Sequence, residues 1–156
     1  EVGAVRYGHG TDLRGRPIMH TPVRLHDRKM ECRVDASIFV AEQLSGEMAT
    51  GKYPGSHGEW CALFDLTGYS IMKNADFKYC YNWIPMLMQH YPERMGVCLI
   101  VNAPIIFHAL WYVASGLLDK RTLSKVVWVG GDYGTKLDAY IEKKYRPRSL
   151  GGTDDT

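Results

Sequence analysis

The sequence predicts a single α/β domain in which helices cover a mostly parallel β-sheet. Three short, mainly apolar runs at residues 59–66, 97–102 and 126–129 indicate strands that are buried on both faces. Segments with helical spacing of apolar residues separate these runs, and this alternation is typical of parallel strands joined by right-handed crossovers. The length of 156 residues suits one domain with a packed core.

The first part of the chain predicts a β-hairpin. Residues 2–10 and 17–25 have strand character, and the polar, glycine-containing segment 11–16 between them has turn chemistry. Pro22 cannot donate a ladder hydrogen bond. We therefore expect the second strand of the hairpin to lie at an edge of the sheet.

A helix is expected on each side of the first buried strand. Residues 35–48 place apolar side chains on one face, and Asp35 is positioned to serve as the N-cap. Residues 75–90 also have helical spacing, but Pro85 lies within them. A proline at this position predicts a kink or a new first turn.

The stretch between Arg94 and Asp119 contains no formally charged side chain. It holds the second strand and then a predicted helix at 105–117 that is apolar nearly all the way round. It is long enough to span a bilayer by count, but its polar and proline interruptions argue against a transmembrane helix. Because such a helix must meet nonpolar material on every side, two interpretations remain open: a buried core helix, or a helix that lines or closes an apolar ligand cavity.

The C-terminal part predicts one more helix and a loose end. After the third strand, residues 135–144 have the spacing of a helix. Residues 147–156 contain Gly, Ser and Asp without periodicity, so we expect a loop followed by disorder.

The composition argues against several classes of function. Hydrophobic residues make up 46% and charged residues 23%, and the net charge of +2 is too small to indicate nucleic-acid binding. The four cysteines have no C-x-x-C spacing, which argues against a zinc site, and we expect reduced thiols in a cytoplasmic compartment.

No catalytic constellation can be assembled from the sequence. The six histidines form no metal-binding motif, and no serine lies in a G-x-S-x-G elbow. Asp65 ends a predicted parallel strand, but without an evident partner it is expected to cap the following turn. We therefore expect no enzymatic activity, no metal and no cofactor.

Glu93 and Lys125 lie near the two ends of the uncharged stretch. One interpretation is that both are ordinary surface charges of small energetic value. The other is that they pair at the mouth of a pocket and bind a phosphate, with the Thr122 hydroxyl as a further donor.

Five motifs follow one another in a single order along the chain. They are DLRGRP at 12–17, FDLTG at 64–68, YPERMG at 91–96 with NAP at 102–104, LDKRTLSKV at 118–126, and LGG at 150–152. This series resembles the CRAL-TRIO, or Sec14-like, family of lipid-binding domains. The resemblance predicts one such domain over residues 1–152 and a short tail at 153–156.

The resemblance implies a sheet floor and helices that enclose an apolar cavity for one lipid, with a mobile gate helix at 105–117. In members that bind phosphatidylinositol, the Glu of Y-P-E-R and the Thr and Lys of T-x-x-K meet the inositol phosphate. The resemblance thereby assigns head-group binding to Glu93, Thr122 and Lys125. The residues expected to form the cavity and gate are Trp60, Ala62, Phe64, Ile106, Phe107, Leu110, Trp111 and Val113.

One departure from the family limits the choice of ligand. Founding members bind phosphatidylcholine through hydroxyl side chains at the positions that here hold Trp60 and Ala62, so exchange of two phospholipids is not supported. We expect a monomeric cytoplasmic carrier of phosphatidylinositol that contacts membranes transiently and binds no nucleic acid. Two alternatives stay open: a carrier of a small isoprenoid-like ligand, or a regulatory, lipid-sensing interaction module of a larger protein.

Overall fold

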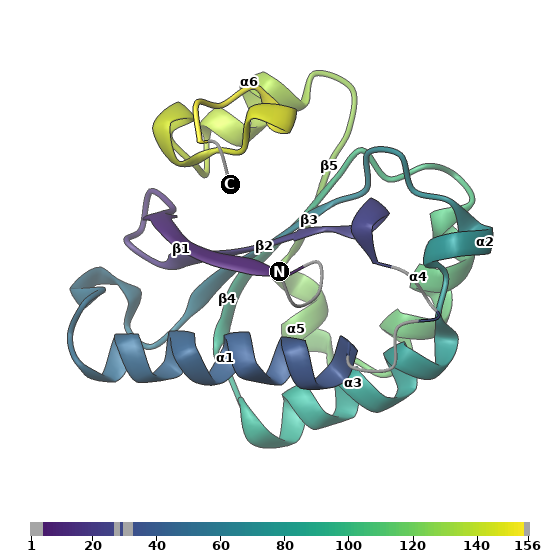
Figure 1. Cartoon of the computed structure of the whole chain (residues 1–156), viewed down its shortest axis with the longest axis horizontal. Helices are drawn as coiled ribbons and strands as arrows, with labels where there is room; N and C mark the ends of the chain where they lie inside the picture. Colours follow the sequence, from purple (N-terminus) through teal and green to yellow (C-terminus); the bar gives the residue numbers. More distant parts are fainter. Residues whose placement is uncertain (1–4, 27–28, 30–32, 155–156) are drawn as a thin grey trace.

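A five-stranded β-sheet runs through the middle of the molecule, with helices on both of its faces (Figure 1). The computed structural model describes residues 5–26, 29 and 33–154. The strands lie side by side in chain order, and they are β1 (Arg6–Thr11), β2 (Pro17–Pro22), β3 (Trp60–Asp65), β4 (Met95–Val101) and β5 (Val126–Val129). The β1–β2 pair is antiparallel and the other pairs are parallel, which confirms the predicted fold class.

The second strand is not at the edge of the sheet. β2 pairs with β1 on one side and with β3 on the other, so the prediction drawn from Pro22 was wrong. Pro22 is the last residue of β2, opposite Asp65. A proline at the end of a strand interrupts little of the ladder, which explains why the strand accepts it.

Two layers of helix cover the sheet. The helical elements are η1 (Val23–Leu25), α1 (Arg33–Ala49), η2 (Pro54–Ser56), α2 (Ile71–Asn74), α3 (Phe77–His90), α4 (Phe107–Ser115), α5 (Lys120–Ser124), α6 (Tyr133–Asp138), η3 (Lys143–Tyr145) and η4 (Arg148–Leu150). α1, α3 and α4 pack on one face, here called the helix-side face. The segment from α6 to residue 154 covers the other, here called the cap face (Figure 1).

The first two long helices differ from their predicted starts. α1 begins at Arg33, so Asp35 lies in its first turn and is not the N-cap. A carboxylate there still interacts favourably with the positive end of the helix dipole. α3 has Asp76 as its N-cap, which accepts a hydrogen bond from the backbone N–H of Tyr79 at 2.9 Å, and it continues through Pro85 as one helix.

The long uncharged stretch divides into β4 and α4. The helix has nine residues, fewer than the predicted segment 105–117. Within the described ranges, no helix combines the length and the apolar character needed to cross a bilayer.

The C-terminal segment is more ordered than expected. α6 ends at Asp138 and a 3-10 turn follows, so the predicted single helix over 135–144 was wrong. Residues 147–154 fold back onto the cap face, where Leu150 is fully buried and the backbone N–H of Arg148 donates to the carbonyl of Asp154 at 3.0 Å. Buried Leu150 and backbone hydrogen bonds such as this one thus order a segment of polar composition, and only residues 155–156 of the predicted loose end lie outside the described part.

Candidate functional site

The two faces of the sheet differ in how completely they are covered. On the cap face, seven apolar side chains have no solvent exposure, namely Cys61, Leu63, Leu99, Val101, Leu137, Ile141 and Leu150. On the helix-side face, Phe64 is only half-buried although it lies on a central strand. The side chains packed around this layer are half-buried as well, and they include Tyr69, Met86, Leu87, Phe107, Trp111 and Val126. The helices therefore leave an apolar layer that is partly accessible to solvent.

Two of the predicted cavity residues lie in the closed part of this layer. Trp60 is 1% exposed and its ring lies 6.0 Å from that of Tyr91, while Ala62 is 2% exposed. Tyr91 in turn donates a hydrogen bond from its hydroxyl to Glu42 on α1. The accessible part therefore lies towards Phe64 and the start of α4.

The predicted gate helix has two different sides. Leu110 and Ala114 are buried, and Phe107, Trp111 and Val113 are half-buried. The other side faces solvent, with Ile106 51% and Tyr112 80% exposed. Ile105, which precedes the helix, is 89% exposed. α4 is therefore not a core helix buried on all sides, which was one of the two interpretations left open by the sequence.

An aromatic cluster ties α4 to the edge strand β5. The ring of Trp128 lies 5.2 Å from Trp111, 5.3 Å from His108 and 6.3 Å from Phe107. Phe107 also meets Tyr69 edge-on at 5.4 Å, which brings the segment before α2 next to the start of α4. Trp128 and Tyr69 were missed from the sequence, although the alternation within residues 126–129 places Trp128 on the same face as Val126.

The predicted head-group residues all lie at or next to α5. Asp119 caps this helix and accepts hydrogen bonds from the backbone N–H of Thr122 at 2.8 Å and from its hydroxyl at 2.9 Å. These bonds lower the pKa of Asp119. The Thr122 hydroxyl is therefore already used as a donor within the helix.

Glu93 forms an ion pair with Arg121 and not with Lys125. The predicted pairing was wrong because Arg121, one helical turn before Lys125, is the cation that faces the loop of Glu93. Glu93 has a φ of 59°, in the left-handed region, which costs a residue other than glycine roughly 1–2 kcal/mol. The Glu93 and Arg121 side chains are 58% and 68% exposed, so the ion pair itself adds little stability.

Lys125 takes part in a second charged group at the beginning of β3 and β4. Its ammonium donates to the carbonyl of Met95 at 2.8 Å and lies 3.8 Å from Glu59 Oε1. The other oxygen of Glu59 lies 3.6 Å from Arg16 Nη1, and Arg16 Nη2 lies 2.6 Å from Asp12 Oδ2. Arg16 and Asp12 are buried. Four alternating charges thus run from the β1–β2 turn to the end of α5.

The remaining reactive groups have structural surroundings. Burial raises the pKa of Cys98 to about 12 and that of Cys80 to about 11, so these thiols stay protonated near neutral pH. Asp65 accepts a hydrogen bond from the Thr67 backbone N–H at 2.9 Å, which confirms its predicted turn-capping role. In the described portion of the chain, no three His, Cys, Asp or Glu side chains are grouped so that they could hold a metal ion.

Comparison with known proteins places these features in a family. A family model described as the CRAL/TRIO domain matches residues 3–152. The CRAL-TRIO domain-containing protein T23G5.2 of Caenorhabditis elegans is 30% identical over 160 residues, which cover 93% of this chain and 22% of that protein. The Sec14 cytosolic factor of Schizosaccharomyces pombe is 27% identical over 158 residues, which cover 94% of this chain and 55% of that protein.

Two further comparisons extend the similarity. The phosphatidylinositol transfer protein CSR1 of Eremothecium gossypii is 29% identical over 146 residues, covering 94% of this chain and 32% of that protein. The crystal structure of Sfh5 superposes with a TM-score of 0.66 at 21% identity, covering 99% of this chain and 55% of that one, and it supports the fold. The chain thus spans between 22% and 55% of the length of these proteins.

Proposed function

The chain belongs to the CRAL/TRIO domain family, and from this premise we propose that it binds one lipid on the helix-side face and transfers or presents it between membranes. The proposal rests on the observation that the helices do not cover that face completely. An apolar layer around Phe64, Phe107 and Trp111 that the helices do not bury completely gains free energy by contacting a lipid tail. Each buried methylene contributes about 0.8 kcal/mol, so an acyl chain is retained without a covalent link.

The proposed ligand is phosphatidylinositol, with its head group at Glu93, Thr122 and Lys125. The cations around α5 already hold carboxylates, since Arg121 pairs with Glu93 and Lys125 lies near Glu59. When a phosphate binds one of these cations, the carboxylate that paired with that cation loses its partner and needs another hydrogen-bond donor. Inositol supplies hydroxyl donors beside its phosphate, whereas choline supplies none. The names of the Sec14 and phosphatidylinositol transfer relatives agree with this choice.

The unusual backbone of Glu93 supports a functional role for its side chain. A loop position in the left-handed region is occupied at lowest cost by glycine or asparagine. Strain of this kind is concentrated at functional sites. A glutamate whose side chain is mostly exposed does not offset that cost by packing, so we infer that its carboxylate serves the ligand.

A second ligand class is favoured by the closed end of the layer. Trp60 and Ala62 are buried and present no hydroxyl group, which suits a ligand without a polar group at that depth. A small isoprenoid-like molecule satisfies this condition. Parallel loading of a phosphoinositide and a neutral isoprenoid separates the two ligands.

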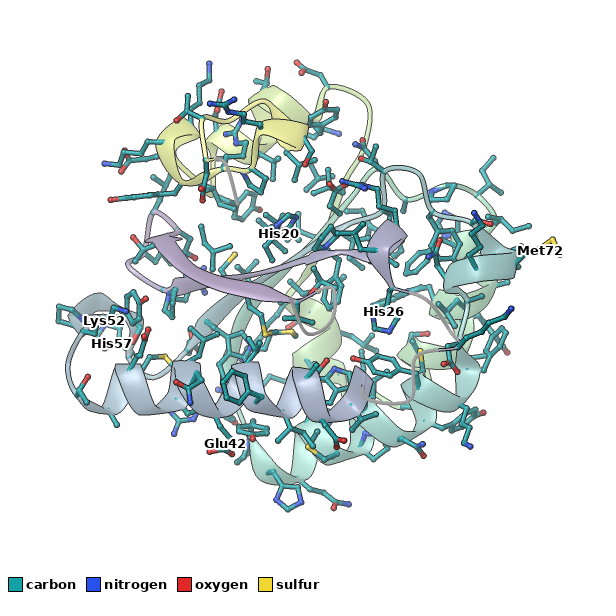
Figure 2. All side chains as sticks on the ribbon, in the orientation of Figure 1. His20, His26, Glu42, Lys52, His57 and Met72 are labelled. Carbon is teal, nitrogen blue, oxygen red and sulfur yellow. The ribbon has the colours of Figure 1, made fainter. Side chains whose placement is uncertain are left out.

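We propose that membrane contact occurs through α4 and the neighbouring end of the domain. Ile105 and Tyr112 are largely exposed there, and Met72 on α2 is 74% exposed. Figure 2 shows Met72 pointing away from the body of the domain at the outer end of α2. Lys73 and Lys78 are exposed on the adjoining helices and add attraction to anionic lipids.

The test is the lipid content of the purified protein. Native mass spectrometry and solvent extraction should find one lipid per chain, and vesicles containing phosphatidylinositol should reload the stripped protein. Lys125→Ala should lower phosphatidylinositol loading about tenfold; because the Met95 carbonyl and Glu59 lose a partner in this variant, loading is measured under conditions where urea unfolding shows the variant to be folded. Absence of copurified lipid together with failure to load any lipid class would reject the proposed function. Unchanged loading by Lys125→Ala would reject the head-group assignment alone.

A further inference from the structure

Glu59 lies between two cations at the beginning of β3. Its two carboxylate oxygens lie 3.8 Å from Lys125 Nζ and 3.6 Å from Arg16 Nη1. The Glu59 side chain is 35% exposed and that of Lys125 19%, so water screens their interaction less than it screens the exposed Glu93–Arg121 pair. Glu59 was not among the residues predicted to bind a ligand.

The two cations differ in how fully they are occupied. Arg16 is buried, and its Nε and Nη2 both contact Asp12 Oδ2 at 2.6 Å. Its charge is therefore compensated within the β1–β2 turn. Lys125 donates to the neutral carbonyl of Met95 at 2.8 Å. Among the described residues, the carboxylate that pairs with Lys125 is that of Glu59. The charges of Asp12, Arg16, Glu59 and Lys125 sum to zero, and loss of the Glu59 charge would leave this group with a net charge of +1.

We propose that Glu59 is the internal counter-ion of Lys125 and that it determines which phosphate head groups the site accepts; this inference rests on the proposed lipid-binding function. An incoming phosphate has to approach Lys125 in the presence of the Glu59 carboxylate. The repulsion between the two anions weakens binding of every head group with a net negative charge, whereas the choline cation compensates the phosphate of phosphatidylcholine. A head group with hydroxyl donors recovers part of this loss, because a hydroxyl can donate to Glu59.

Glu59 therefore discriminates most strongly against a phosphate that lacks neighbouring hydroxyls. Phosphatidic acid presents a bare phosphomonoester that, once it has lost both protons, has two negative charges and no donor for Glu59. Phosphatidylinositol presents one negative charge and several hydroxyls. The carboxylate consequently raises the preference for phosphatidylinositol over phosphatidic acid.

The experiment measures the lipid taken up by stripped protein from phosphatidylcholine vesicles that contain a minor fraction of either phosphatidylinositol or phosphatidic acid. Glu59→Gln keeps the shape of the side chain and removes its charge. This variant should take up about three- to tenfold more phosphatidic acid than the wild type, with a smaller gain for phosphatidylinositol and none for phosphatidylcholine. The double variant Glu59→Gln with Lys125→Ala should lose the gain.

A matched control separates this effect from general attraction to anionic vesicles. Glu142→Gln also raises the net charge by one, and Glu142 pairs with Lys144 at 3.0 Å in the segment that covers the cap face. Its uptake of both anionic lipids should equal that of the wild type. Glu59→Ser serves as the second variant if the glutamine variant unfolds at lower urea concentration than the wild type.

The outcomes distinguish this inference from the proposed function. Wild-type uptake of phosphatidylinositol with no change in the lipid preference of either Glu59 variant overturns the role of Glu59 and leaves the proposed function standing. An equal gain in Glu142→Gln also overturns it, because the effect is then one of net charge. If the wild type and all variants take up no lipid, the proposed function fails first.

Discussion

Substitution of two neighbouring residues on β3 tests whether the two faces of the sheet are closed to different degrees. Leu63 points to the cap face and has no exposure, whereas Phe64 points to the helix-side face and is half-buried. In a fully packed core, Leu→Ala costs about 2–5 kcal/mol and Phe→Ala about 3–5 kcal/mol. Equal packing on both faces therefore predicts that Phe64→Ala costs as much as Leu63→Ala or more.

The structure predicts the reverse order for the lipid-free protein. Leu63→Ala should cost about 3 kcal/mol or more, because the closed cap face cannot refill the space. Phe64→Ala should cost about 1–2 kcal/mol, because part of the ring already contacts solvent and its removal leaves no sealed cavity. The same variant should nevertheless load less lipid than the wild type, since the ring belongs to the proposed tail-binding layer.

Urea unfolding of stripped protein, followed by circular dichroism, measures both free energies from the midpoints and slopes. Repeating the measurement after loading should stabilise the wild type more than Phe64→Ala, because the ligand stabilises the folded state in proportion to its affinity. If lipid-free Phe64→Ala loses as much stability as Leu63→Ala, the helix-side face is as tightly packed as the cap face and the reasoning is refuted.

Three further predictions concern the membrane, the C-terminal segment and pH. Ile105→Asp should slow lipid transfer between vesicles several-fold while equilibrium loading stays the same. The control Phe39→Asp, at a 61% exposed position on α1, should transfer lipid at the wild-type rate. Equal slowing in both variants would contradict the proposal that α4 and its neighbourhood face the membrane. Leu150→Ala should lower the unfolding free energy by about 2–5 kcal/mol in the urea assay, and a loss below about 1 kcal/mol would mean that residues 147–154 are not anchored on the cap face. Burial raises the pKa of Cys98 from 9.0 to about 12, so the unfolded chain loses this proton at lower pH than the folded protein, and stability should fall as pH rises from about 9 towards 12. Cys98→Ala should show a shallower fall over that range, and an identical pH profile would contradict the burial of this thiol.

The buried strands were predictable because layers of protein cover both of their faces, and such strands consist mainly of apolar residues. A strand covered on both faces needs apolar side chains at nearly every position. The runs at 59–66, 97–102 and 126–129 accordingly match β3, β4 and β5 within two residues at each end. The motif series predicted the family correctly, and the family model matches residues 3–152.

Local chemistry misled where a distant contact decided the outcome. Pro22 argued for an edge strand, but the residues that pair with β2 lie about forty positions further along the chain, at Ile18↔Cys61 to Pro22↔Asp65. Residues 147–154 carried no periodic signal, because isolated contacts hold them on the cap face, among them the buried side chain of Leu150 and the bond between Ser149 and Asp65.

The structure brings the three candidate head-group residues near one another but pairs their charges differently from the sequence-based interpretation. Glu93, Thr122 and Lys125 were identified from motifs, and the structure places all three at or beside α5. Arg121 and Lys125 are four positions apart, so spacing along the chain could not decide which cation meets Glu93. Glu59 gave no signal, because its role depends on where Lys125 and Arg16 lie after folding.

The order of motifs and the apolar runs by themselves determined the family, the α/β class and the three buried strands, because these follow from local composition and from residues within one segment. Only the tertiary structure decided that more of the apolar layer stays partly accessible on the helix-side face than on the cap face. It alone decided that Lys125 faces Glu59 and that Arg121 faces Glu93. The physical reason is that exposure and charge pairing are set by side chains from segments far apart in the chain, and these meet only when the helices pack on the sheet.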